Sequence, residues 1–130
     1  SIMTAHGFIS HFIHPDDIFD DYRSGDKGWR ELYEDFGKML KRMEKSYPWL
    51  KSRTSGDAAL QVAATLNSQI SRQQTDEGLA VQIERYSLPQ YFILRSDKRI
   101  GKLNNSKVMK IDEHTYLVEA TDERFNIELK

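Results

Sequence analysis

The residues best suited to chemistry lie in one short segment near the start of the sequence. Residues 10–17 read Ser-His-Phe-Ile-His-Pro-Asp-Asp, which places two imidazoles close to two carboxylates. Imidazole and carboxylate groups are natural ligands of zinc and similar divalent metals. His11, His14, Asp16 and Asp17 are therefore the candidate residues of a catalytic or metal site.

The spacing of the two histidines limits how they can act together. Successive side chains of a strand point to opposite faces, so His11 and His14, three positions apart, point to opposite sides. They can ligate one metal ion only if the chain turns before His14. His14 with Asp16 or Asp17 is therefore the more credible local pair.

The same residues also fit the start of a short helix. His14 can serve as the N-cap and Pro15 as the first helical residue, while Asp16 and Asp17 favour the positive end of the helix. The capping interpretation and the site interpretation are both open on the sequence alone.

Trp49 is the candidate ligand-binding aromatic residue, since an indole ring can stack against a sugar ring. It stands in Tyr-Pro-Trp-Leu at 47–50. The nearby Trp29 and Tyr33 recur at helical spacing, so we expect them in the core rather than in a binding site.

Composition removes several classes of function. The 130 residues carry 19 Lys and Arg against 20 Asp and Glu, a net charge of −1, which argues against nucleic acid as the main partner. The sequence has no cysteine, so disulfides, thiolate zinc sites and cysteine nucleophiles are excluded. No apolar run approaches the length of a membrane span, and no glycine-rich phosphate loop is present.

Hydrophobic periodicity predicts the helices that must position these residues. Residues 7–13 predict a short strand, and a stripe of apolar side chains at helical spacing predicts a helix over 29–47, which Pro48 ends. We expect Phe36 and Leu40 of this stripe to be buried. A weaker helix is predicted over 57–66, with a small apolar face made by Ala59, Val62, Ala63 and Leu66.

After Asn67 the period of the apolar residues changes from 3.6 to 2. Short segments separated by turn residues follow at 68–74, 79–84, 91–94, 108–111, 115–120 and 125–130. This pattern is typical of a small antiparallel sandwich. The predicted fold class is α+β, an N-terminal strand and two helices followed by an antiparallel β-sandwich of five or six strands. The predicted division is a strand, loop and helix segment over 1–66 and a sandwich module over 67–130.

Several motifs follow one another along almost the whole chain. They are Ser-His-Phe-Ile-His-Pro-Asp-Asp at 10–17, Tyr-Pro-Trp-Leu at 47–50, Thr-Ser-Gly-Asp at 54–57, Phe-Ile-Leu-Arg at 92–95 and Tyr-Leu-Val at 116–118. In this order they resemble the C-terminal part of uncharacterised bacterial proteins with a polysaccharide-deacetylase-like (β/α) barrel. The resemblance implies that residues 1–66 derive from the barrel and that His11 and His14 serve its site.

The resemblance implies a carbohydrate-active, deacetylase-like protein of the bacterial cell envelope that acts on cell-surface polysaccharide. It implies a divalent metal, zinc, in a longer parent protein. The chain departs from the deacetylase pattern, whose two histidines are four positions apart, and most of the barrel lies outside it. We therefore expect this chain alone to be inactive and to hold no cofactor.

Two other interpretations stand beside this one. His-Pro-Asp-Asp at 14–17 also resembles the zinc motif of Rossmann-type N-acetylglucosaminyl deacetylases. This resemblance implies that His14 and Asp17 are the metal ligands and that Asp16 is a catalytic residue acting as base, beside the catalytic roles of His11 and His14. The alternative of a different class is a non-catalytic accessory β-sandwich module that binds glycan or protein. An exposed apolar helix face would in addition favour a homo-oligomer.

The metal hypothesis predicts weak zinc binding that depends on His14. Three groups within four residues cannot surround a tetrahedral ion, so open positions should be left over. Binding should weaken below about pH 6 as the imidazole protonates. Calorimetry with zinc on the chain and on His14→Ala measures this, and equal heats from both would favour the helix cap.

Overall fold

The computed structural model describes residues 19–130 and divides the chain into two compact units, Ser1–Ser46 and Tyr47–Lys130. The strand predicted over 7–13 lies outside the described residues. The predicted domain division at residue 66 stays a prediction, since compactness alone does not define a domain boundary.

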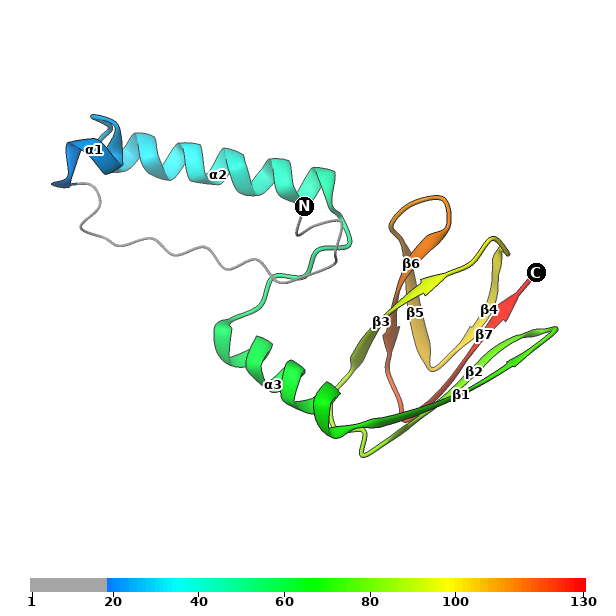
Figure 1. Ribbon diagram of the computed structural model, residues 1–130. Helices are drawn as coiled ribbons and strands as arrows, with labels where there is room; N and C mark the ends of the chain where they lie inside the picture. Colours follow the sequence, from blue (N-terminus) through cyan, green and yellow to red (C-terminus); the bar gives the residue numbers. More distant parts are fainter. Residues whose placement is uncertain (1–18) are drawn as a thin grey trace. The chain divides into compact units, whose positions relative to one another are not determined.

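The first unit contains the helices α1 (Asp21–Ser24) and α2 (Trp29–Ser46) (Figure 1). The Asp20 carboxylate caps α1 by accepting from the backbone N–H groups of Tyr22 and Arg23, and Gly25 ends it in the left-handed conformation at a φ of 62°. α2 ends at Ser46, as expected from Pro48, because a proline disfavours helical geometry in the residue before it.

An ion-pair network ties the start of α2 to the preceding turn. The carboxylate of Asp35 contacts the Lys27 ammonium at 2.6 Å and the Lys38 ammonium at 3.0 Å. The hydrogen bond from Lys27, followed by that from Lys38, lowers the pKa of Asp35 to about 2. The Asp35 carboxylate therefore stays ionised throughout the neutral pH range.

The apolar stripe of α2 is not buried. We define the α2 stripe as Trp29, Leu32, Tyr33, Phe36, Leu40 and Met43; none of the 18 residues of the helix is buried. The expected burial of Phe36 and Leu40 is wrong, since Leu40 is 43% exposed and Phe36 is only partly buried. Periodicity predicts which residues share a face, but burial also needs a second apolar surface, which residues 19–28, the other described part of this unit, do not supply.

The helix of the second unit is α3 (Ser55–Asn67). The Thr54 hydroxyl caps it by accepting from the backbone N–H of Asp57 at 3.1 Å, and donates to the Asp57 carboxylate at 2.7 Å. The helix thus starts earlier than predicted. Its predicted apolar face is exposed, since Leu66 is 79% exposed and Val62 is exposed too, and the helix buries Ala64 instead. The small side chain of Ala64 allows close packing, which apolar periodicity alone does not reveal.

Seven strands follow α3 and form two antiparallel sheets (Figure 1). One has the order β1-β2-β7-β4 and the other the order β3-β6-β5. The strands are β1 (Gln69–Thr75), β2 (Gly78–Glu84), β3 (Gln90–Arg95), β4 (Ile100–Asn104), β5 (Ser106–Lys110), β6 (Thr115–Ala120) and β7 (Arg124–Leu129). This arrangement confirms the α+β fold class and the strand-rich C-terminal part. The additional strand is β4, whose alternation is interrupted by an irregularity between Ile100 and Leu103.

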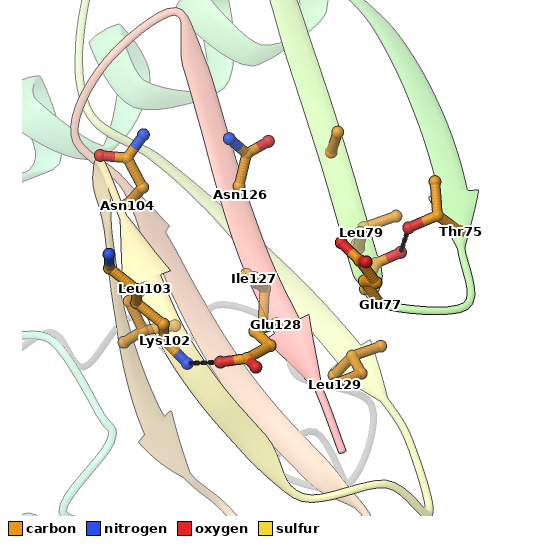
Figure 2. Close-up of a pocket in the computed structure, with 12 residues that line it drawn as sticks. Thr75, Glu77, Leu79, Lys102, Leu103, Asn104, Asn126, Ile127, Glu128 and Leu129 are labelled. Carbon is orange, nitrogen blue, oxygen red and sulfur yellow. Dashed lines mark hydrogen bonds between the residues drawn. The ribbon is translucent and has the colours of Figure 1, made fainter.

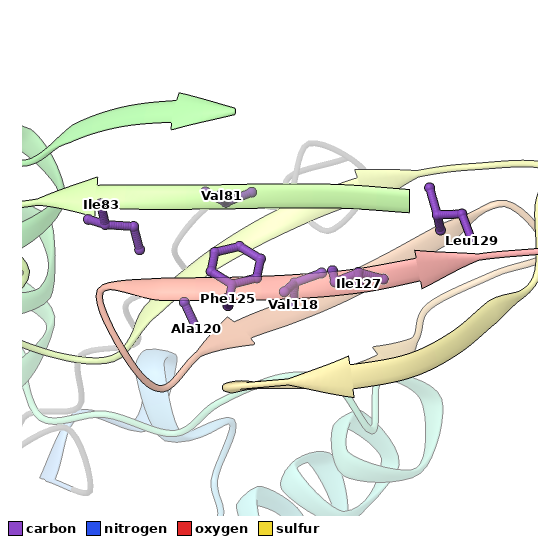
Figure 3. Packing of buried hydrophobic residues seen from close by; sticks show 7 residues of the cluster. All are labelled: Val81, Ile83, Val118, Ala120, Phe125, Ile127 and Leu129. Atoms are coloured by element: carbon purple, nitrogen blue, oxygen red, sulfur yellow. The ribbon is translucent and has the colours of Figure 1, made fainter. Parts of the chain in front are cut away.

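The core lies between the two sheets and is made by every second residue of the central strands (Figure 3). Its buried members are Val81, Ile83, Val118, Ala120, Phe125, Ile127 and Leu129. The Phe92 ring stacks on the Phe125 ring with centroids 5.8 Å apart, which joins the two sheets. Each fully buried aliphatic or aromatic side chain of this kind contributes about 1.5–3 kcal/mol to folding.

The difference between core and surface predicts a contrast between two alanine substitutions. Ile83 is 1% exposed. The substitution Ile83→Ala should lower the free energy of unfolding by about 2–5 kcal/mol, because it leaves a cavity. Leu66→Ala removes a side chain of the same size from the surface of α3 and should cost less than about 1 kcal/mol. Urea unfolding of both variants measures this, and similar losses would contradict the assigned core.

Candidate functional site

The candidate residues from the sequence fall into two groups. His11, His14, Asp16 and Asp17 lie outside the described residues, so their catalytic and metal-binding roles stay predictions. Trp49 belongs to the second unit, where it is partly buried and its ring meets the Tyr47 ring edge-on with centroids 6.0 Å apart.

The segment that carries Trp49 is attached to the three-stranded sheet at two points. The Lys51 ammonium lies 3.9 Å from the Glu119 carboxylate on β6. The Arg53 guanidinium donates to the Tyr91 hydroxyl on β3 at 2.9 Å. The segment that carries Trp49 is therefore anchored to this sheet through Lys51 and Arg53, while the role of Trp49 in ligand binding stays a prediction.

A hollow of about 820 Å³ lies on the four-stranded sheet, along β2, β7 and β4 (Figure 2). The polar side chains that line it are Thr75, Glu77, Lys102, Asn104, Asn126 and Glu128. Strand alternation explains their direction, because Ile127 points into the core and its neighbours Asn126 and Glu128 therefore point to the outer face. We call this feature the outer hollow.

The floor of the outer hollow is made by small residues. Ala80 on β2 pairs with Asn126 on β7, and Asn126 pairs with Asn104 on β4, so these three residues form one row across the sheet. Gly78 pairs with Glu128 in the next row of the same face. A Cβ atom at Gly78 would overlap the carbonyl oxygen of Ile127, so a side chain cannot be added at this position without moving the backbone.

The carboxylate of Glu128 is fixed by its neighbours. One oxygen accepts from the backbone N–H of Lys102 at 2.7 Å, and the other lies 3.3 Å from the Lys130 ammonium. These interactions, that of the Lys102 N–H first, lower the pKa of Glu128. The hydrogen bond from the Lys102 N–H depends on Gly101, which lies in the irregular part of β4. Because Gly101 has no side chain, the carboxylate of Glu128 has room beside it. A Cβ atom at Gly101 would lie 2.5 Å from an oxygen of the Glu128 carboxylate.

This arrangement is suited to binding hydroxyl groups rather than to proton transfer. A carboxylate with a lowered pKa is ionised at neutral pH and accepts hydrogen bonds, so it cannot act as a general acid there. The two asparagine amides each offer two donors and an acceptor. Among residues 19–130, no group of three or more side chains of the metal-binding types is placed to hold a metal ion.

Sequence reasoning missed the residues of the outer hollow. Asn104 lies outside the predicted strands, and Asn126 and Glu128 are the polar members of an alternating strand, which normally face solvent with no further role. The one sequence signal of the hollow is Ala80, a small residue at an outward-facing position of the neighbouring strand. Its significance depends on strand register, which the sequence does not reveal.

Across the described part of the chain, none of the helices has the length and apolar character required to cross a membrane.

A family model described as an uncharacterised protein conserved in bacteria (DUF2194) matches residues 1–117. No curated protein and no solved structure matches the chain significantly. Nothing in this match indicates a polysaccharide deacetylase or a (β/α) barrel, so the deacetylase resemblance is wrong. Short ordered motifs do not specify a barrel, and four residues such as His-Pro-Asp-Asp fit a helix cap equally well.

The environment of Glu128 predicts a dependence of stability on pH. Folding lowers the pKa of this carboxyl below its ordinary value of 4.5. The unfolded chain therefore takes up the proton first as pH falls, and the stability that Glu128 contributes is present above about pH 4.5 and lost as the pH drops through the folded-state pKa.

Two variants test this linkage in thermal unfolding measured between about pH 3 and pH 6. Glu128→Gln should remove part of the acid sensitivity. Gly101→Ala should displace the carboxylate and move its pKa, followed by NMR, back toward 4.5. An unchanged pKa of Glu128 in Gly101→Ala would show that the Lys102 contact does not control it.

Proposed function

The chain belongs to the bacterial family DUF2194, and we propose that its second unit is a non-catalytic β-sandwich module that binds a polyhydroxylated ligand, with cell-surface polysaccharide as the ligand class. The outer hollow is the single observation that carries the proposal. It combines a small-residue floor with amides and a fixed carboxylate on three adjacent strands.

The chemistry of the outer hollow favours a glycan over a protein surface. Protein interfaces are centred on buried aromatic, Met and Arg side chains, with charged residues depleted from the core of the patch. The side chains that line the hollow include no aromatic residue, and its apolar members Leu79 and Leu103 pack against the core. What it offers outward are hydrogen-bonding groups, which hydroxyl-rich ligands can satisfy as donor and acceptor together.

The rigidity of the site supports recognition despite its shallowness. Apart from Glu77 in the short turn between β1 and β2, its polar residues stand on paired strands rather than on loops, so little conformational entropy is lost when a ligand binds. The turn beside Asn104 is held by Asn105, whose side-chain amide donates to the carbonyl oxygen of Arg124 at 2.9 Å. An open site with few hydrogen bonds predicts a dissociation constant of about 0.1–1 mM for one short oligosaccharide.

The proposal also places this protein at the cell envelope, because that is where bacterial cell-surface polysaccharide is found.

Two substitutions in the outer hollow test the proposal with soluble bacterial polysaccharide and its oligosaccharides. Ala80→Leu should abolish binding, because it fills the floor with a side chain. Asn126→Ala should weaken binding by about tenfold, the loss expected for one or two hydrogen bonds. Affinity electrophoresis for the polymer and calorimetry for the oligosaccharides measure these changes.

The matched control is Gln82→Ala, which alters an exposed residue of the same strand that does not line the outer hollow. Binding should be unchanged. If Trp49→Ala abolishes binding and Ala80→Leu does not, the site lies with the segment around Trp49. If none of the glycans binds, the proposal is wrong.

A further inference from the structure

We infer that the ligand of the outer hollow is an extended, uncharged oligosaccharide that lies across the strands of the four-stranded sheet, and that Gln73 on β1 is a further binding residue. This inference rests on the proposed function and adds the direction of the ligand, its charge and one contact outside the hollow. Strand register, unpartnered amide side chains and the charges of the outer face support it.

The row of Ala80, Asn126 and Asn104 continues onto the edge strand β1, where Gln73 pairs with Ala80. Residues directly opposite each other on paired strands point to the same face, so Gln73 faces outward as Ala80 does. Adjacent strands are about 4.8 Å apart, and the row from Gln73 to Asn104 therefore spans about 14 Å. We call these four residues the amide row.

The three amide side chains of the amide row are available to a ligand. Gln73, Asn104 and Asn126 are all exposed, and within residues 19–130 their side-chain amides make no hydrogen bond. Figure 2 shows the side chains of Asn104 and Asn126 next to each other on adjacent strands. Between Asn126 and Gln73 stands only the methyl group of Ala80, so a chain of sugar units can pass over it and reach amides on both sides.

The charged residues of the outer face flank the amide row instead of lying in it. On one side the next row pairs Gln82 with Arg124, and on the other side the next row pairs Gly78 with Glu128. A ligand that ran along β7 would pass over both a cation and an anion. A ligand that follows the amide row across the strands meets only amides and a methyl group, which favours the crosswise direction.

The flanking charges favour an uncharged ligand. Arg124 and Glu128 have opposite signs, and so do Glu77 and Lys102, the other charged residues of the hollow. These charges therefore give the amide row no net attraction for an anion or for a cation. An uncharged chain leaves the charged groups in water, whereas the charged groups of an acidic or basic chain would each lie near a like charge.

Gln73 and Gln74 form a matched pair, since they are neighbours on β1 that point to opposite faces. Gln73 pairs with the outward residue Ala80, whereas Gln74 pairs with Leu79, which packs against the core. Both glutamines are exposed. The same substitution at the two positions therefore alters the same kind of side chain on the same strand, and only Gln73 belongs to the amide row.

The span of the amide row sets how the length of the ligand should matter. One sugar unit of an extended chain is roughly as long as the spacing between two strands, so the row accommodates about three units. A disaccharide seated on Asn104 and Asn126 ends before it reaches β1. The third unit passes Ala80 and is the first that can bond to Gln73.

Calorimetry of the full chain tests the inference with neutral and acidic oligosaccharides of increasing length, prepared from soluble bacterial polysaccharide. The affinity for neutral chains should rise up to about three units and then level off. Gln73→Ala should weaken binding of the trisaccharide by about fivefold, the loss expected for one hydrogen bond, and should leave binding of the disaccharide unchanged. Gln74→Ala should change neither, and added salt should have little effect on the neutral chains.

Equal effects of Gln73→Ala and Gln74→Ala, an affinity that does not depend on chain length, or tighter binding of the acidic chains would each overturn the inference. If Ala80→Leu still abolishes binding in those cases, the proposed function stands and only the direction, charge and extent of the ligand are wrong. If no oligosaccharide binds to the unaltered chain, the proposed function and this inference fail together.

Discussion

Burial of the inner faces of β2, β7 and β6 is the interaction on which the rest of the second unit depends. Ile83, Ile127 and Val118 are almost completely buried between the two sheets. Because side chains alternate along a strand, fixing these residues inward forces their sequence neighbours outward. The outer hollow is a consequence of this packing, since the register of the strands then aligns Ala80 with Asn126 and Asn126 with Asn104.

The two units are stabilised in different ways. The second has a continuous hydrophobic core, whereas α1 and α2 are held by a helix cap and by the ion pairs of Asp35. Exposed ion pairs contribute little to stability, and α2 leaves Trp29, Tyr33 and Leu40 of its apolar stripe exposed. A strong hydrophobic pattern without complete burial is thus a property of α2 in the described part of the chain.

Much of the fold could be predicted from the sequence because it follows from periodicity. The end of α2 before Pro48 and the change to a period of 2 after Asn67 are local signals. β4 was missed because its irregular pairing breaks the alternation, and the apolar face of α3 was misjudged because Ala64 packs where Leu66 does not. The candidate site could not be predicted, since Asn104, Asn126 and Glu128 become neighbours only through strand register, which no local pattern encodes.

The binding surface is tested most directly by an NMR titration of the nitrogen-labelled chain with a soluble bacterial polysaccharide fraction. If the outer hollow is the site, the backbone amide signals of Ala80, Asn104 and Asn126 will move together and saturate, while those of β3 and β5 stay in place. Shifts confined to the three-stranded sheet or to the segment around Trp49 would contradict that assignment, and so would the absence of any shift at saturating polysaccharide.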